Sequence, residues 1–424
     1  MTAQARLFKI GTFDFRLNHL LVIGVLVLSF SISFLIRSQG AEYGNELNEF
    51  DPFQNFRATK FIVDNGFLEY YDWHDYKSWY PEGRNISATS QNMLHFTAAF
   101  TYQIFGGNLS LYDFTILFPA IFGSLTVIGI FALVRVIGGT TAGLFAAILF
   151  SVSLPILLRG KIGWFKAEPL GLFYGIIALY LFLSGIKTEN KKIAITKLII
   201  GGIIFAFGLS AWGGIQFFII PIGMFILLLP FVRKDHEFII WSVPIFVTSL
   251  LLSTLMFERP GTGFVFGLGG ISLIVSTGFL VFCIIIQKFS KIKNKTRNGL
   301  IFLFMVIIIS SVLMTINEEA GFLKLPQFRY LYAINPFLTS TNPLQDSIAE
   351  QANTTISQSF FFHSILMIFA GLGIWIILSK KSKTILNIRN DMIVFSLIIG
   401  LTGIYISSAF IRLEVFASIS LIIL

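Results

Sequence analysis

The segment Asn48–Arg57, NEFDPFQNFR, marks the point where the chain changes from apolar to polar. It follows an apolar run, Leu17–Ile36, that is long enough to cross a lipid bilayer as a helix. Two acids of the segment, Glu49 and Asp51, therefore lie close to the place where this run leaves the membrane. A polar stretch that ends at Trp79-Tyr80-Pro81 comes next.

Composition predicts an all-α protein that crosses the membrane many times. Of the 424 residues, 55% are hydrophobic and only 12% are charged, whereas about a quarter of the residues of soluble domains are charged. Apolar runs of spanning length recur along the chain, and a helix satisfies its own backbone polar groups in lipid. The one cysteine, Cys283, excludes an internal disulfide or a thiolate metal cluster.

The net charge of +9 does not indicate a nucleic-acid partner. The basic residues gather in four short links between apolar runs, as the positive-inside rule predicts for cytoplasmic loops. We therefore place the N-terminus in the cytoplasm and the acid-rich loops outside. The basic links are Lys187–Lys197, Arg233-Lys234, Lys288–Arg297 and Lys380–Arg389.

This orientation divides the chain into a cytoplasmic tail, 1–16, and a transmembrane domain, 17–424. Outer loops are expected at 38–112, 159–167 and 317–357, and the apolar stretch Met93–Phe105 is too short to span. We expect an interfacial or buried helix there, because counting it as a span would put the later basic links outside. Further spans are predicted near 115–137, 141–158, 168–187, 196–210, 214–232, 238–256, 264–287, 299–316, 358–379 and 390–410, before a final apolar run at 411–424.

Each outer loop carries a carboxylate near the bilayer: Asp51, Glu168 and Glu350. Carboxylates from separate loops suit a hard divalent cation such as Mg²⁺ or Mn²⁺, which neutralises charge on a phosphate leaving group. Each acid also has a simpler explanation. Asp51 precedes Pro52 as a helix N-cap would, Glu168 is favoured by the dipole at a helix start, and Glu350 lies in a polar loop.

Arg412 lies among apolar residues near the outer end of a late helix. Charges within a membrane are expensive and usually functional, so we expect Arg412 to contact a phosphate or a glycan. The alternative is that its side chain snorkels to the interface.

Five motifs in order resemble the catalytic subunit of oligosaccharyltransferase, of the archaeal-type dolichyl-phosphooligosaccharide–protein glycotransferase family. Glu49-Phe50-Asp51-Pro52, with Asn55-Phe56-Arg57, is similar to the E-F-D-P-x-x-N-Y-R motif of that family. The other four matches are Trp79-Tyr80-Pro81-Glu82-Gly83-Arg84, Ser210-Ala211-Trp212-Gly213-Gly214, Ser347-Ile348-Ala349-Glu350 and Arg412-Leu413.

The resemblance implies a glycosyltransferase of the C-type fold, with about 11–13 transmembrane helices and two large outer loops. Such an enzyme transfers an oligosaccharide from a dolichyl or polyprenyl (di)phosphate carrier to asparagine in Asn-X-Ser/Thr. Asp51 and Glu350 would be catalytic, and together with Glu168 they would bind Mn²⁺ or Mg²⁺. The residues expected to contact the donor or the acceptor are Arg412, Arg57, Glu49, Trp79 and Tyr80.

Two departures from the family pattern leave alternatives open. In Lys166-Ala167-Glu168, the second acidic motif, lysine stands where the family has its leading aspartate. The acceptor-reading W-W-D-Y-G motif of the soluble C-terminal domain is also absent, so a separate domain or subunit is an expected partner. The alternatives are a related glycosyltransferase that uses a polyprenyl-phosphate sugar, an inactive paralogue that binds lipid-linked sugar, and a transporter. A transporter predicts charges at the bilayer midplane.

Overall fold

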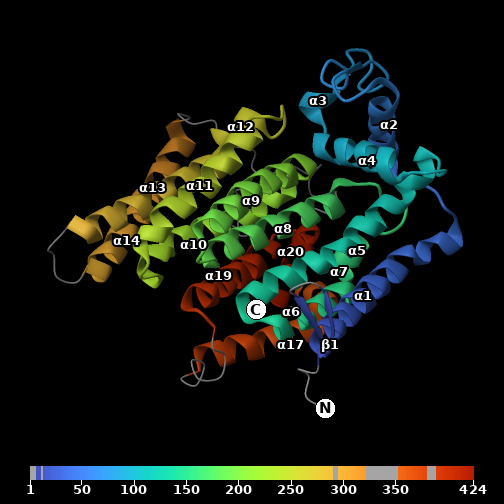
Figure 1. Cartoon of the computed structure of the whole chain (residues 1–424). Helices are drawn as coiled ribbons and strands as arrows, with labels where there is room; N and C mark the ends of the chain where they lie inside the picture. The colour runs from blue at the N-terminus through green and yellow to red at the C-terminus, as the bar shows by residue number, and fades with distance from the viewer. Residues whose placement is uncertain (1–5, 11–12, 290–294, 321–351, 380–387) are drawn as a thin grey trace.

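The computed structural model describes residues 6–10, 13–289, 295–320, 352–379 and 388–424. It is a bundle of long apolar helices with a smaller polar unit at one end, formed by α2, α3 and α4 (Figure 1). Within the described residues, nine helices are long and apolar enough to span a membrane. This confirms the predicted polytopic helical fold.

Four helices build the centre of the bundle. α5 (Leu111–Gly138), α8 (Ala167–Lys187), α9 (Lys191–Ala211) and α11 (His236–Thr254) pack in that order, each against the next. α8 is the most enclosed of the spans, with phenylalanine and leucine side chains buried along its length. Its first turn, which carries one of the candidate acids, is therefore held rigidly.

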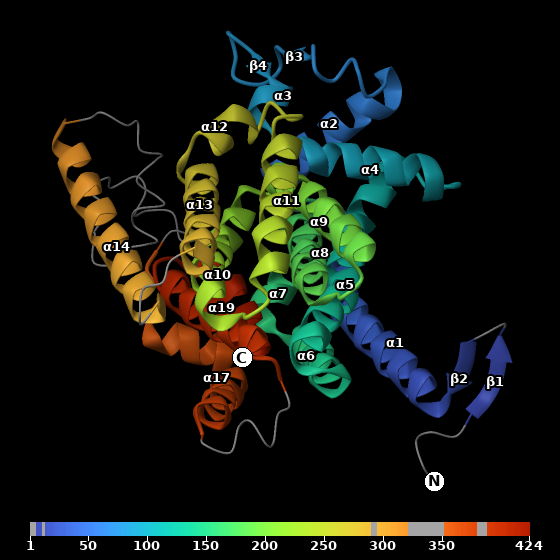
Figure 2. The same ribbon diagram turned by 60° about the vertical axis from the view of Figure 1, so that its left-hand side comes forward.

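The remaining spans surround this centre. α1 (Leu17–Ser38) lies along the edge of the bundle and leaves most of its apolar surface exposed, as a lipid-facing helix does (Figure 2). The other spans are α10 (Ile219–Val232), α13 (Leu268–Phe289), α17 (Ile356–Leu378) and α19 (Asn390–Ser407). Two further helices, α14 (Lys295–Ala320) and α20 (Glu414–Ile423), are not among the nine. Single-turn helices join them: η1 (Gln39–Tyr43), η2 (Gly213–Phe218), α12 (Gly261–Val265) and η4 (Ile411–Leu413).

The predicted span 141–158 was wrong as one helix. α6 (Thr140–Val152) ends at Ser153, whose backbone is extended, and α7 (Leu154–Leu158) starts a separate turn. Pro155 explains the break, because proline has no N–H for the helix ladder and disfavours helical backbone before it.

The outer unit contains α2 (Phe50–Asn65), α3 (Ile86–Thr89) and α4 (Asn92–Phe105), with the two-residue strands β3 (His74–Asp75) and β4 (Arg84–Asn85). Figure 2 shows α4 lying across the end of the bundle rather than along it, in agreement with the prediction that it does not span. The N-terminal residues also hold a feature that the sequence did not suggest: β1 (Arg6–Ile10) pairs antiparallel with β2 (Phe13–Arg16).

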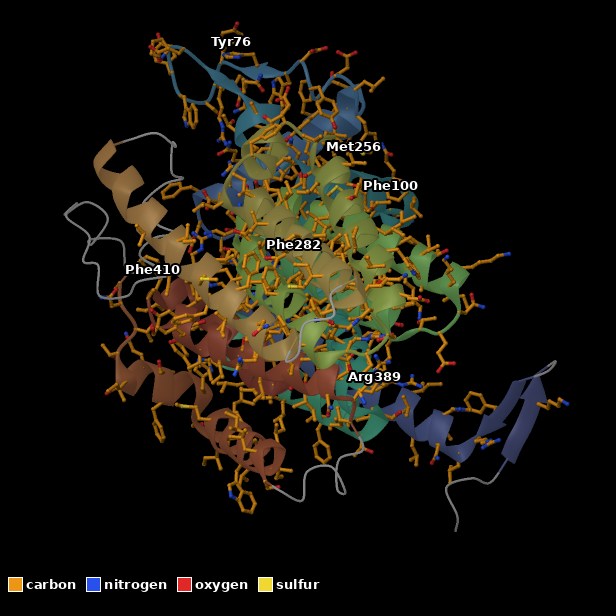
Figure 3. The ribbon with its side chains drawn as sticks, turned by 90° about the vertical axis from the view of Figure 1, so that its left-hand side faces the viewer. Tyr76, Phe100, Met256, Phe282, Arg389 and Phe410 are labelled. Atoms are coloured by element: carbon orange, nitrogen blue, oxygen red, sulfur yellow. The ribbon has the colours of Figure 1, made fainter. Side chains whose placement is uncertain are left out.

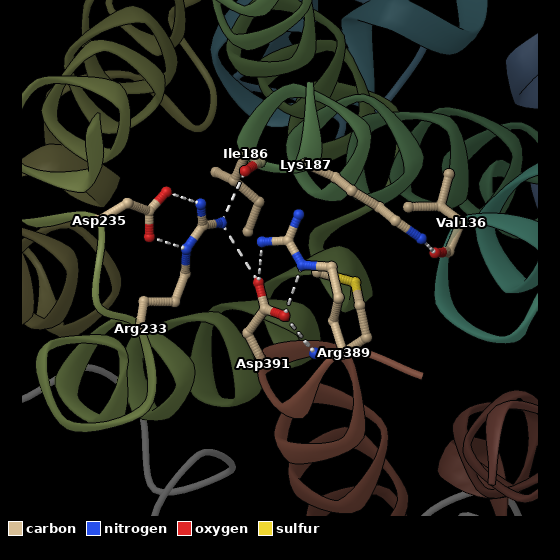
Figure 4. A network of polar contacts seen from close by, with 8 residues as sticks. Val136, Ile186, Lys187, Arg233, Asp235, Arg389 and Asp391 are labelled. Atoms are coloured by element: carbon tan, nitrogen blue, oxygen red, sulfur yellow. Dashed lines mark hydrogen bonds and ion pairs between the residues drawn. The ribbon is translucent and has the colours of Figure 1, made fainter. Parts of the chain in front are cut away.

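The opposite end of the bundle is held by an ion network (Figure 4). Arg233 pairs with Asp235 and donates to the Ile186 carbonyl at 2.7 Å and to Asp391 at 3.2 Å. Arg389 adds a second contact to the buried Asp391 at 2.8 Å. Described residues of three of the four basic links, Lys187, Arg233 and Arg389, therefore lie at one end, and Figure 3 places Arg389 at the end opposite Tyr76 of the outer unit.

Candidate functional site

The first and second predicted outer loops meet directly through their backbones. The Asn48 N–H donates to the Gly163 carbonyl at 3.0 Å, and the Gly163 N–H donates to the Ile116 carbonyl at 2.9 Å. Gly163 has φ of +75°, and a Cβ there would lie 2.2 Å from the Glu46 carbonyl oxygen. Only glycine fits this crossing, which brings the start of α2 next to the start of α8.

Arg37 anchors the same region from below. It lies in the last turn of α1, and its side chain is buried. It donates to Ser33 Oγ and to the carbonyls of Ile156 and Leu157 in α7 at 3.2, 3.1 and 3.3 Å. Since buried charges require such partners, Arg37 fixes α7 and the following loop against α1.

A buried polar chain holds α2 in place from its other side. Asn55 donates to the Phe165 carbonyl at 2.9 Å, and its Oδ1 lies 3.1 Å from Nε2 of His95 on α4. Nδ1 of His95 lies 2.7 Å from the Tyr70 hydroxyl, whose oxygen also lies 3.2 Å from Asn92 Oδ1. Burial, together with the positive charge of Arg84, lowers the pKa of His95 to about 3, so the ring is neutral. Sequence reasoning gave His95 no role; its only signal is the spacing of Asn92 and His95 on one helical face.

Asp51 lies in the first turn of α2 and is not its N-cap, a position that Glu49 occupies. The Asp51 side chain is 73% exposed. Lys166 Nζ lies between the two acids, 2.5 Å from Glu49 Oε2 and 3.4 Å from Asp51 Oδ2. The same ammonium lies 4.2 Å from the centroid of the Trp164 ring. The structure thus brings together Glu49, Asp51 and Lys166, which the motifs had singled out separately.

Glu168 lies two residues beyond Lys166, in the first turn of α8, but it faces other partners. It is buried and accepts a hydrogen bond from Arg412 Nη2 at 2.9 Å, and Arg159 Nη1 lies 3.9 Å from the same oxygen. Pro169 follows it within the same first turn, where its missing N–H costs no helical hydrogen bond. Glu168 and Arg412 therefore form one ion pair that joins α8 to the turn before α20.

Three other predicted residues, Arg57, Trp79 and Tyr80, lie in the outer unit. Arg57 pairs with Asp75, whose pKa is lowered: burial opposes ionisation, but hydrogen bonds from Ser78, the Lys77 N–H and Arg57 outweigh it. Trp79 and Tyr80 are exposed, and the Arg84 guanidinium lies over the Trp79 ring at 4.7 Å.

The remaining motif residues lie in different surroundings. Phe50 is exposed and Ala167 is buried. The motif Ser347-Ile348-Ala349-Glu350 lies outside the described residues, so its predicted role stays a prediction.

Beside Arg412, the structure reveals a polar group that the motifs did not indicate. Glu414 is buried at the start of α20, pairs with His363 of α17 and accepts from Ser359 Oγ at 3.0 Å. Nδ1 of His363 lies 3.3 Å from Ser418 Oγ. These contacts fix the turn that presents Arg412 to Glu168.

The described residues do not form a complete metal site. No group of three His, Cys, Asp or Glu side chains converges among them. Glu168 faces two arginines, and an ammonium separates Glu49 from Asp51. Within the described part of the chain, the candidate site is a pair of exposed carboxylates that contact Lys166, together with the buried Glu168, which faces Arg412 and Arg159.

Comparisons with known proteins agree with this architecture. A dolichyl-diphosphooligosaccharide–protein glycosyltransferase subunit STT3B of Arabidopsis thaliana is 25% identical over 418 residues, which cover 94% of this chain and 54% of the relative. The chain therefore spans about half the length of such relatives.

Two solved structures of the Archaeoglobus fulgidus oligosaccharyltransferase share the fold. One, AglB in complex with an inhibitory peptide and a dolichol-phosphate, superposes with a TM-score of 0.72 at 17% identity, over 96% of this chain and 50% of that one. The other, a complex with Zn and sulfate, has a TM-score of 0.67 at 18% identity, over 94% and 48%.

A family model described as the N-terminal part of oligosaccharyl transferase STT3 matches residues 25–423, nearly the whole chain. The chain therefore belongs to the STT3 family of oligosaccharyltransferases.

Proposed function

We propose that this chain is the membrane part of an enzyme that transfers an oligosaccharide from a dolichyl or polyprenyl (di)phosphate to asparagine in Asn-X-Ser/Thr. One observation carries the proposal beyond family membership: Glu49 and Asp51 of the first family motif meet Lys166 of the second, beside the Glu168–Arg412 pair. Carboxylates and cations thus meet at one end of the bundle.

The residues suit a displacement at the anomeric carbon of the sugar. The amide nitrogen is a poor nucleophile, and a carboxylate that accepts hydrogen bonds from the amide orients it and weakens its conjugation. As the carbon–nitrogen bond forms, the bond from carbon to the phosphate oxygen breaks, and its electron pair leaves with the phosphate. The amide proton passes to a carboxylate, for which Asp51 is the exposed candidate. The cations at the site stabilise the departing phosphate.

The family resemblance implies Mn²⁺ or Mg²⁺, held by Asp51, Glu168 and Glu350. Such an ion neutralises charge on a leaving phosphate. The described donor set does not fit it, since Glu168 is paired with arginine and Lys166 contacts Asp51.

Position in the membrane is part of the proposal. The basic network of Arg233, Arg389 and Lys187 lies at the end opposite the outer unit, which supports a cytoplasmic location for that end. The N-terminus would then be cytoplasmic and the active site would be on the outer face of the cell membrane. A separate soluble domain or subunit is the expected partner for reading the acceptor.

The test is transfer of a labelled glycan. Membranes that contain the chain would be supplied with lipid-linked oligosaccharide and a peptide carrying Asn-X-Thr, with the matching Gln-X-Thr peptide as the control. A glycopeptide formed only from the asparagine peptide, and lost in Asp51→Asn, is the expected result. Equal activity of Asp51→Asn and the unaltered chain would contradict the assigned site.

Lys166 also favours a second candidate, an inactive paralogue that binds lipid-linked sugar. Its ammonium pairs with both acids at the start of α2, and a closed ion pair of this kind would keep the acceptor amide away from Asp51. This candidate predicts donor binding without transfer.

A further inference from the structure

We infer that Lys166 supplies the cation of this site, so that a tethered ammonium takes the place of a divalent metal ion. The inference rests on the proposed transfer reaction. It predicts an oligosaccharyltransferase whose chemistry does not depend on added metal.

The position of the ammonium carries the argument. Its nitrogen lies 2.5 Å from Glu49 Oε2 and 3.4 Å from Asp51 Oδ2, and the face of Trp164 is 4.2 Å away. All three groups attract positive charge. The Lys166 side chain is only 13% exposed, so the cation is held at one place rather than free in solvent.

The same contacts disfavour a metal ion at this place. Mg²⁺ and Mn²⁺ require several oxygen ligands close to the ion, whereas Lys166 pairs with both acids of α2. A divalent ion next to the ammonium would also be repelled by its positive charge. The third acid, Glu168, is neutralised by Arg412 and Arg159.

Two energetically unfavourable features of the local structure indicate that this arrangement is more than a surface ion pair. Lys166 is the N-cap residue of α8 and makes no capping bond with its side chain, although Ser, Asp and Asn are preferred there and a helix start repels cations. Glu49 has φ of +70° and ψ of −179°, a conformation that is strained for any residue but glycine. Local costs of this kind concentrate at functional sites.

The chemistry of lysine suits this role. Its ammonium carries three hydrogen-bond donors on a flexible stem. Two donors face Glu49 and Asp51, which leaves one N–H for an oxygen of the leaving phosphate. The positive charge then offsets the negative charge that develops there when the bond to the sugar breaks.

The first experiment measures metal binding without any turnover. The full chain in lipid nanodiscs is titrated with Mn²⁺ and followed by electron paramagnetic resonance. We expect no saturable binding in the unaltered chain and one bound ion in Lys166→Asp, which restores an acid and offers a better N-cap. Lys161→Asp, the same change at an exposed position of the same loop, is the control and should gain no site. Saturable binding by the unaltered chain would overturn the inference.

The second experiment measures glycan transfer in membranes from cells that carry each variant. The unaltered chain should keep its activity in EDTA, and Lys166→Asp should lose activity in EDTA and regain it with Mn²⁺. Lys166→Met, which removes the charge, should lower transfer about a hundredfold with or without Mn²⁺. Loss of the unaltered activity in EDTA would refute the inference and leave the proposed function intact. Transfer by Lys166→Asp alone would refute both the inference and the proposed transfer by the unaltered chain, because Lys166 would then be an inactivating residue, as the inactive-paralogue candidate predicts. If no variant transfers glycan, the proposed function fails while Mn²⁺ binding still decides whether lysine holds the cation position.

Discussion

Because Glu168 is buried, its ion pair with Arg412 predicts that removal of the arginine lowers the free energy of unfolding. Glu168 is 2% exposed and Arg412 is 43% exposed, so removal of the arginine leaves a buried carboxylate whose remaining charged partner among the described residues is Arg159, 3.9 Å away. Breaking a fully buried pair costs about 3–5 kcal/mol and exposed pairs contribute at most about 1 kcal/mol. Because this pair lies between those cases, we expect Arg412→Ala to lower the free energy of unfolding by about 2 kcal/mol.

The neutral substitution Glu168→Gln should cost less, since its amide oxygen still accepts from Arg412 and the arginine reaches solvent. The double variant Arg412→Ala/Glu168→Gln should be more stable than Arg412→Ala alone, because no unpaired charge stays buried. The free energies come from SDS titration of the chain in mixed micelles. Arg135→Ala, at an exposed position in the last turn of α5, is the control. A double variant less stable than Arg412→Ala would refute this account of the pair.

Three further predictions use other parts of the chain. Glu350→Ala should abolish transfer if this acid completes the site; full activity in a glycopeptide assay would remove it from the proposal. Acid should destabilise the outer unit, because a His95 pKa near 3 means that the folded state binds fewer protons than the unfolded chain below about pH 6.5. At pH 5 the free energy of unfolding is lower by about 2 kcal/mol for this reason. Thermal unfolding of His95→Gln should show a flatter pH dependence than that of the unaltered chain, and an equal slope would contradict a neutral His95. In a glycosylating host, mass spectrometry should find glycan on Asn108 and none on Asn294; the reverse would invert the topology.

Much of the fold was predictable because long apolar runs leave few choices in lipid. The bounds of α5, α8 and α11 lie within a few residues of the predicted spans, and α4 was expected to be too short to cross. The break between α6 and α7 was missed even though Pro155 marks it. The pairing of β1 with β2 was also missed, because short polar strands give a weak pattern.

At the site, motif matching selected residues but not their partners. Glu168 and Lys166 are two positions apart in one motif, yet one faces Arg412 and the other faces Asp51. Their separation follows from the first turn of α8, where successive side chains point in different directions. The polar chain through Asn55, His95 and Tyr70 could not be read from the sequence, since its contacts join residues far apart along the chain.

The order and type of the residues alone establish that this chain is a polytopic helical membrane protein, which residues match the family motifs, and that lysine replaces an acid at position 166. These features follow from apolar length, local order and residue type. The packing of the helices is needed to establish that the Lys166 ammonium lies between Glu49 and Asp51, and that Glu168 is paired with Arg412. Which charges meet depends on how α2, α8 and the turn before α20 pack, and a Coulomb interaction depends on distance in space rather than on separation along the chain.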